Sequence, residues 1–219
     1  MKVLLALFGV VGLLASGPAA ADPSRGTTAF QGSAERIDVA TRERMSGVSW
    51  RPGCPVGFGE LRLLTVSHWG FDGRVHRGRL VVHRDYATGM VGAMRKLFRL
   101  RYPIRRMRLV DAYGADDHRS MGADNTSAFN CRYVAGSPGV WSEHAYGRAI
   151  DVNPVENPYV TESGYVSPPA GARFADRGHA KGVIHRGGPV VSAFAAIGWE
   201  WGGNWFWPKD YQHFSATGS

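Results

Sequence analysis

The stretch WSEHAYGRAIDVNP, residues 141–154, decides the fold prediction, because within it a polar turn passes into an alternating strand. Gly147 permits the tight change of direction that such a turn requires. The residues that follow it alternate between apolar and polar, as in a strand with one face against a core. We therefore expect Ile150 and Val152 to point into the core and Asp151 to point to the opposite side.

His144 precedes Asp151 by seven residues, and their imidazole nitrogen and carboxylate oxygen are both ligands that Zn²⁺ accepts. A surface hydrogen bond would explain this pair equally well. The C-terminal sequence DYQHF, residues 210–214, adds a second histidine, His213. A catalytic zinc needs three protein ligands and one open position. His144, Asp151 and His213 would provide the three ligands. Asp210 is then either the general base for an attacking water or a turn residue.

The neighbours of these residues have less specific roles. Ser142 is expected to orient a ligand rather than to act as a nucleophile. Glu143 and Arg148 are expected at the surface. Trp201 and Trp205 could line a substrate groove, although aromatic residues of this kind more often belong to a core or to a rigid cover.

The rest of the chain predicts a mixed domain. LRLLTVSHW (61–69) and GRLVVH (78–83) alternate as two paired strands. Apolar residues recur every three or four positions in a helix that Asp85 would cap and that ends before Pro103, and a second helix is expected from Pro189. Because strands and helices do not alternate strictly, the fold class is α+β with an antiparallel sheet.

Composition and pattern predict the structure of two other segments. MRLVDAY, residues 107–113, has the pattern of a further strand. Residues 156–187 are rich in proline, glycine and polar side chains, which predicts a loop of unusual length. Such loops are often functional.

The N-terminus has the layout of a secretory signal, with one lysine, a short apolar run and small residues that end at Ala21. The apolar run is shorter than the ~20 residues needed to cross a bilayer. We expect a signal peptide over residues 1–21, a leader over 22–50 and a single domain over 51–219. The protein would then be secreted, periplasmic or attached to the cell wall, with no membrane span after signal removal.

Cys54 and Cys131 are the only cysteines in the chain. In an oxidising compartment two cysteines usually pair, so we expect a disulfide between them. The alternative is a reactive thiol at Cys131 that works with a histidine, as in a cysteine amidase or transpeptidase.

The formal net charge is +8, and almost all of the positive charge is arginine. For an exported protein an anionic polymer of the cell envelope is a more natural partner than nucleic acid. The basic residues cluster at 95–101 and at 105–108, where solvated faces are the simplest interpretation. We expect a monomer.

The combined motif, Ser142-x-His144-x-x-Gly147-x-Ala149-x-Asp151 with a later Asp210-x-x-His213-Phe214, resembles the M15 zinc peptidases. These are D-alanyl-D-alanine carboxypeptidases and L-alanyl-D-glutamate endopeptidases, and residues 199–205 resemble the endopeptidase branch. The resemblance implies a small antiparallel sheet with flanking helices, similar to DD-peptidases and hedgehog domains, with zinc at the sheet. It also implies the ligands and base proposed above, and peptidoglycan stem peptides as substrate.

One position departs from the family pattern. The family usually has an arginine directly after a tyrosine, upstream of the first zinc histidine, but here Tyr113 is followed by Gly114. A guanidinium is the donor that a developing oxyanion needs. Arg119 is the first candidate for this role and Arg132 is the second.

Other classes of site fit less well. The sequence contains no HExxH motif and no Ser-x-x-Lys with Lys-Thr-Gly set. The other six histidines are expected to be structural or at the surface, and they are His68, His76, His83, His118, His179 and His185. A non-catalytic module of the same fold that binds cell wall is the alternative function, although such a module would have no need of Asp210.

Overall fold

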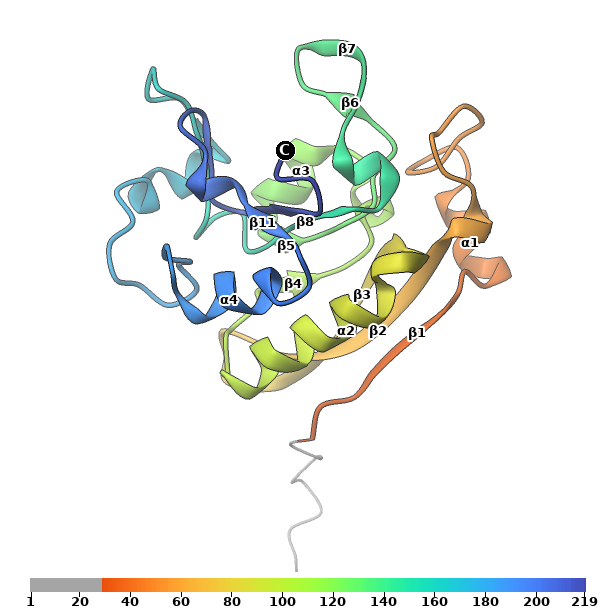
Figure 1. Ribbon diagram of the computed structural model, residues 1–219, viewed down its shortest axis with the longest axis horizontal. Coiled ribbons are helices and arrows are strands. Elements are labelled where there is room, and N and C mark those ends of the chain that lie inside the picture. The colour runs from red at the N-terminus through yellow and green to blue at the C-terminus, as the bar shows by residue number, and fades with distance from the viewer. Residues whose placement is uncertain (1–28) are drawn as a thin grey trace, which may run out of the picture.

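The longest strands of the computed structural model, which describes residues 29–219, are β2 (Leu61–Trp69) and β3 (Val75–His83). They pair antiparallel over their whole length, which confirms the predicted strand pair. Strand β1 (Gly32–Arg36) pairs with β2 and completes a three-stranded sheet (Figure 1). The predicted signal peptide lies outside the described residues.

Helix α2 (Arg84–Arg99) packs across this sheet (Figure 1). Its residues at helical spacing, among them Met90, Met94 and Leu97, are almost fully buried, as their periodicity predicts. The expected cap at Asp85 was wrong by two residues. His83 is the N-cap, and its Nδ1 accepts the Asp85 N–H at 3.3 Å.

The larger hydrophobic core lies between this sheet, α2 and the C-terminal half of the chain. Leu64 and Leu80 reach it from the long strands, while Ile150 and Phe214 reach it from the strands that carry the proposed ligands. Both Ile150 and Val152 are fully buried, as predicted. The proposed site is therefore built on strands that pack against the main core.

A smaller core covers the other face of the large sheet and includes Met45 and Phe129. Beside it, Cys54 and Cys131 form the predicted disulfide, with 5.9 Å between their Cα atoms. The described part of the predicted leader contributes β1 and helix α1 (Val39–Met45), so it is integrated into the sheet and this core.

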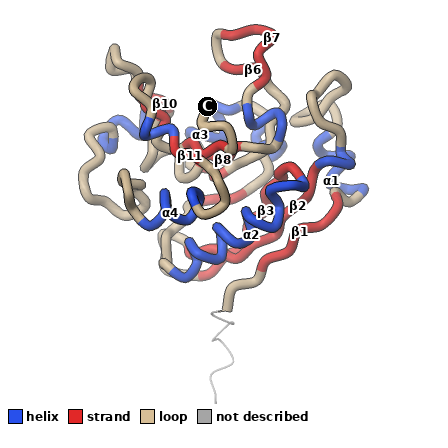
Figure 2. The backbone as a smooth tube through the Cα atoms, in the orientation of Figure 1, coloured by secondary structure: helices blue, strands red, loops and turns tan. Residues whose placement is uncertain are grey.

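The C-terminal half contains two sheets of short strands. One has the order β11-β13-β8, with bounds Glu200–Trp201, His213–Ser215 and Ala149–Asp151. The other has the order β10-β9-β12, with bounds Val166–Ser167, Tyr159–Val160 and Lys209–Asp210. Figure 2 shows that these strands are separated by long stretches without regular structure. The fold is thus α+β with several small antiparallel sheets.

The remaining elements are short. They are η1 (Phe58–Glu60), β4 (Arg106–Met107), η2 (Val110–Tyr113), α3 (Asp117–Gly122), β5 (Asn125–Thr126), β6 (Tyr133–Val134), β7 (Ser137–Trp141), η3 (Glu143–Tyr146), η4 (Pro169–Phe174), α4 (Pro189–Ala195) and η5 (Gly202–Asn204). No helix in the described part of the chain is long and apolar enough to cross a membrane.

Two predicted segments differ from the structure. The strand predicted at 107–113 ends at Met107, and the chain then turns into η2, where Asp111 accepts a hydrogen bond of 2.7 Å from Ser49 Oγ. The segment 156–187 is not a structureless loop, since it contains β9, β10 and η4. Paired strands of two residues and a 3₁₀ helix have too few positions to show a period in the sequence.

Candidate metal centre

His144, Asp151 and His213 meet at the edge of the β11-β13-β8 sheet, and each offers one ligand atom within 4.8 Å of the others. His213 pairs directly opposite Asp151 in the strand register, and its Nδ1 lies 3.2 Å from Asp151 Oδ1. His144 Nε2 lies 3.3 Å from Asp151 Oδ2 and 3.3 Å from His213 Nδ1. Within residues 29–219 this is the only such group of three histidine, cysteine or acidic residues.

The hydrogen bonds of the two imidazoles determine which nitrogens are free to bind a cation. His144 Nδ1 lies 2.5 Å from the carbonyl oxygen of Ala128, and His213 Nε2 lies 3.2 Å from that of Ser219. A carbonyl oxygen can only accept, so each of these nitrogens carries a proton. In the neutral imidazoles that bind a metal, the lone pairs therefore lie on His144 Nε2 and His213 Nδ1, which both face Asp151. When an imidazole is protonated, the same nitrogen donates to Asp151 instead.

These separations fit a tetrahedral metal. Zinc bonds of about 2.0–2.1 Å place neighbouring ligand atoms about 3.3–3.4 Å apart. The closest approaches among the three side chains, 3.2 to 3.3 Å, agree with that spacing, with each histidine nearest to a different oxygen of Asp151. Two histidines and one carboxylate are also a donor set typical of catalytic rather than structural zinc. The residues present therefore fit a zinc ion.

The charge of Asp151 suits a ligand. Burial alone would raise the pKa of its carboxyl group, but the hydrogen bonds and charges of His144 and His213 outweigh burial and lower it. Burial likewise disfavours the charged form of His213, yet its hydrogen bond with Asp151 raises its pKa. Asp151 thus stays ionised at neutral pH, as metal binding requires.

The turn before β8 holds His144 in place. Ser142 is the N-cap of η3, and its Oγ accepts the backbone N–H of His144 at 3.3 Å. Gly147 ends η3 with φ +68° and lies so close to β3 that a Cβ there would come within 2.6 Å of the His83 nitrogen. His83 also donates a hydrogen bond to the Gly147 carbonyl at 2.8 Å. Only glycine tolerates both the positive φ and the close approach to β3, so this turn is fixed against the large sheet.

Glu143 and Arg148 were expected at the surface, and both are only partly exposed because they pair with each other. Arg148 Nη2 donates to Glu143 Oε1 at 2.9 Å, with the side chains 31% and 13% exposed. The left-handed turn at Gly147 brings these two residues, five apart in sequence, onto the same side. The ion pair therefore spans the turn that carries His144.

Asp210 lies on β12, beside the three ligands. Its Oδ1 is buried and has no hydrogen-bond partner within the described residues. Burial and the negative charge of Asp151 raise the pKa of Asp210 to about 6. Gly202 permits the close approach, since a Cβ there would lie 2.6 Å from the Asp210 carbonyl oxygen. A carboxylate with an unpaired oxygen and a raised pKa is suited to accept a proton.

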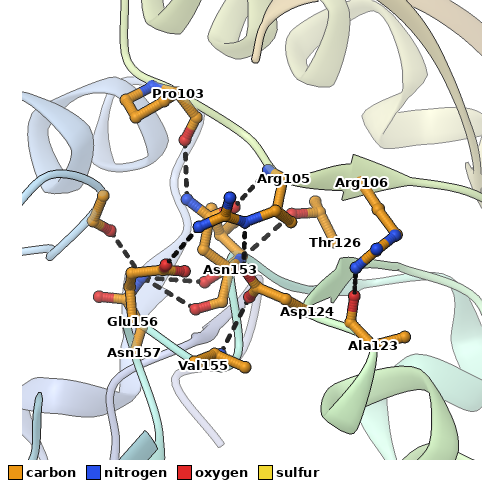
Figure 3. Close-up of polar contacts among 12 residues, drawn as sticks. Pro103, Arg105, Arg106, Ala123, Asp124, Thr126, Asn153, Val155, Glu156 and Asn157 are labelled. Atoms are coloured by element: carbon orange, nitrogen blue, oxygen red, sulfur yellow. Dashed lines mark hydrogen bonds and ion pairs between the residues drawn. The ribbon is translucent and has the colours of Figure 1, made fainter. Parts of the chain in front are cut away.

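A polar network supports the chain after Asp151 (Figure 3). Asn153, two residues on, donates to the carbonyl of Pro103 at 2.7 Å and accepts the Arg105 N–H at 3.1 Å. The Arg105 guanidinium then binds Asp124 and Glu156, at 3.3 and 3.1 Å. This network ties the end of β8 to the segment between α2 and β4.

Neither proposed arginine pairs with Asp151 or Asp210 in the described part of the chain. Arg119 is 77% exposed and forms an ion pair with Asp116 of its own turn. Arg132 is 32% exposed and pairs with Asp117. Its carbonyl oxygen accepts the Ser142 N–H at 3.1 Å, so the Arg132 segment runs directly beside the residues that precede His144.

The two tryptophans differ in position. Trp201 is 3% exposed, belongs to the larger core, and donates its indole N–H to the carbonyl of Tyr211 at 2.8 Å. Trp205 is partly exposed, and its ring centroid lies 5.6 Å from that of His213. Trp205 is therefore the one that borders the ligand cluster directly.

Some contributors to the site could not be identified from the sequence. The carbonyl oxygens of Ala128 and Ser219 orient the two imidazoles, and backbone atoms leave no residue-type signal. Ser127 and Asp151 pair through two backbone hydrogen bonds of 2.9 and 3.1 Å. This pairing joins segments that no sequence motif connects.

The cysteine alternative is excluded, because both cysteines are in the disulfide. An α+β fold with a buried His-Asp-His cluster beside a free carboxylate defines a candidate metallohydrolase. Residues 135–216 match the peptidase M15 family model described as D-alanyl-D-alanine carboxypeptidase, so this part of the chain is similar to the M15 peptidases. The match includes all three ligands and Asp210. No curated protein and no solved structure matches the chain.

Proposed function

We propose that this protein is an exported zinc peptidase that hydrolyses a peptide bond in peptidoglycan stem peptides. The observation that carries the proposal is the set of 3.2 to 3.3 Å approaches among His144, Asp151 and His213, which suits a tetrahedral cation. When bound, zinc would polarise the substrate carbonyl and lower the pKa of a water ligand. The family match supports a peptide as substrate.

The chain's own residues have separate tasks. Asp210, with its raised pKa and unpaired buried Oδ1, takes the proton of the attacking water and passes it to the leaving amine. Ala128 and Ser219 keep the imidazole protons away from the ligand cluster. Ser142 orients the backbone of His144.

For the oxyanion, we place Arg132 ahead of Arg119. The Arg132 segment is hydrogen-bonded to Ser142, whereas the Arg119 side chain is exposed and paired with its own helix cap. The Arg132 side chain starts from backbone beside the residues that precede His144, and once released from Asp117 its guanidinium would meet the developing charge. Arg132→Ala should therefore lower the rate of cleavage more than Arg119→Ala.

The disulfide supports an oxidising compartment, and so secretion to the periplasm or cell wall. The signal peptide, the division into domains and the monomeric state stay predictions. Trp205 is the better candidate to line the substrate groove, since Trp201 is held in the core.

The test is digestion of purified muropeptides followed by mass spectrometry. Treatment with a chelator should abolish cleavage, zinc should restore it, and the mass of the fragments identifies the bond. His213→Ala should remain inactive at any zinc concentration, while the exposed-histidine control His76→Ala should cleave normally. Cleavage that survives both the chelator and His213→Ala would refute the proposal. Sedimentation with cell walls without cleavage would instead favour the binding module.

A further inference from the structure

A separate hollow in the surface lies between α1, β3 and the segment that begins at β4. It has a volume of about 200 Å³ and is lined by four arginines together with apolar residues that include Met107 and Leu109. The arginines are Arg44, Arg77, Arg79 and Arg108. We call this hollow the arginine pocket. Among the described residues no carboxylate lines it, and it shares no residue with the metal centre.

The positive charge of the arginine pocket is poorly balanced by the protein itself. Arg79 has one carboxylate nearby, Asp38, at 3.7 Å. Arg77 Nη1 donates to the neutral side chain of Gln31 at 2.8 Å. Within residues 29–219 the guanidinium groups of Arg44 and Arg108 form no ion pair or hydrogen bond, although the charge of Arg44 acts on the partly buried Asp111 carboxyl group.

Four like charges on one hollow repel each other, and this repulsion opposes folding unless an anion binds there. The apolar residues between the arginines form a low-dielectric wall on one side of the hollow, and such a wall focuses the field of the arginines. The arrangement therefore has the electrostatics of an anion site rather than those of a solvated face.

The shape of the donors and the size of the hollow narrow the ligand class. The planar fork of a guanidinium matches two oxygens of a phosphate group and forms charge-assisted hydrogen bonds with it. A hollow of 200 Å³ is below the ~300–1,000 Å³ of sites for drug-sized ligands. The hollow can hold a phosphate group together with the groups bonded directly to it.

We propose that the arginine pocket binds phosphate groups, either as a free polyphosphate anion or within a phosphodiester polymer of the envelope. Arg44 and Arg108 provide the uncommitted charge, while Arg77 and Arg79 are held in place by Gln31 and Thr41. Three of the four arginines are exposed, so a group within a long chain can reach them. The proposal does not depend on peptidase activity.

The test measures binding of the purified exported chain to two probes, sodium pyrophosphate and a glycerol-phosphate polymer, by titration calorimetry. The variant is Arg44→Gln with Arg108→Gln. The matched control is Arg74→Gln with Arg99→Gln, which removes the same charge from exposed arginines outside the pocket. The pocket variant should weaken binding at least about tenfold, because it removes two charge-assisted contacts. The control should change binding less than about twofold under the same reasoning.

The two probes distinguish the source of the phosphate. Equal binding per phosphate assigns the site to a free anion, and binding of the polymer alone assigns it to the envelope. An equal loss of binding affinity in the pocket variant and in the control would overturn the proposal, because it would show that net charge alone attracts the probes. Absence of binding to both probes would also overturn it. Thermal unfolding checks that both variants fold, and Arg44→Gln alone replaces the pair if it does not. Unchanged muropeptide cleavage by the pocket variant separates this result from the proposed function.

Discussion

The β1-β2-β3 sheet and the β11-β13-β8 sheet are both antiparallel but differ in the length of their strands (Figures 1 and 2). Different interactions hold them together. The first has two strands of nine residues, paired throughout and covered by the sixteen residues of α2. The second has strands of two or three residues. Its position depends on single contacts, such as those of Gly147 with His83 and of Ser127 with Asp151.

This difference indicates which parts of the chain contribute mainly to stability and which contribute mainly to function. Apolar burial over long elements spreads the stabilising free energy over many side chains. The site strands bury Ile150 and Phe214 in the same core, but hydrogen bonds set the direction of their polar side chains. Changes at the ligands should therefore affect activity far more than folding, whereas changes at the contacts between the two sheets should affect both.

The largest effect is expected at the proposed base. Asp210→Asn keeps the shape of the side chain but removes its capacity to accept a proton. It should lower kcat for muropeptide cleavage by about 10²–10⁴-fold. Because Asp210 is not one of the three ligands, zinc content and the unfolding temperature should change little. Steady-state kinetics, metal analysis and thermal unfolding of the same preparation measure kcat, zinc content and the unfolding temperature.

The control for this variant is Asp176→Asn, which alters an exposed aspartate in the same half of the chain. It should retain full activity. If Asp210→Asn lost zinc together with activity, the residue would be a ligand and the assignment of a base would be wrong.

The second effect concerns the contact between the two sheets. Gly147→Ala combines a backbone at φ +68° with a Cβ only 2.6 Å from the His83 nitrogen. Strain and overlap together should cost about 2–4 kcal/mol of the free energy of unfolding. Gly164→Ala is a matched control, because φ there is +85° but nothing lies within 4 Å of the added Cβ. Its cost should be about 1–2 kcal/mol, from backbone strain alone.

Denaturant unfolding of the two variants measures the difference. A similar loss in both would show that the close approach to β3 contributes nothing and that only the left-handed backbone matters. The turn would then be independent of the large sheet.

The sequence predicted the large sheet well and the short strands poorly, for a physical reason. The nine-residue strands and α2 repeat their apolar positions often enough to establish a period. Strands of two residues such as β9 and β12 cannot show one. The segment 107–113 looked like a strand because Leu109 and Val110 are apolar, yet Asp111 bonds to Ser49 and the chain turns.

For the site, the sequence motifs predicted which three side chains meet, but not their surroundings. His144, Asp151 and His213 could be chosen because metal binding restricts residue types. The ion pair of Glu143 with Arg148 depends on the left-handed turn between them, and its five-residue spacing is typical of neither a helix nor a strand. The arginine of the family pattern could not be located, because the motif is altered at Gly114.

A smaller effect should make stability depend on pH. Burial and the neighbouring carboxylate of Asp124 raise the pKa of Glu156 from 4.5 to about 7, with Arg105 acting in opposition. The folded state therefore holds the proton more tightly than the unfolded state does. The stability that this proton contributes is complete below pH 4.5 and is lost as the pH rises through 7. The loss should be at most about 3 kcal/mol.

Glu156→Gln imitates the protonated form at every pH, so the variant should lack this decline. Unfolding by denaturant at intervals from pH 4.5 to pH 8 compares it with the wild type. Glu162→Gln, at an exposed glutamate, should retain the decline. An identical pH dependence in all three proteins would show that Glu156 is ionised in the fold across this range, and that the network of Figure 3 does not hold a proton.

The smallest effect tests how far a single hydrogen bond positions a ligand. Ser142→Ala removes the acceptor of the His144 N–H, a contact of 3.3 Å at the start of η3. Loss of such a cap should cost about 1 kcal/mol of stability. Because the same bond orients a ligand, zinc affinity should fall about tenfold or more. Ser46→Ala, which removes a serine hydroxyl bond at the end of α1, should leave zinc affinity unchanged. If Ser142→Ala lost stability without any loss of zinc affinity, the bonds to Ala128 and Asn130 would be sufficient to place His144, and the serine of the motif would serve the turn alone.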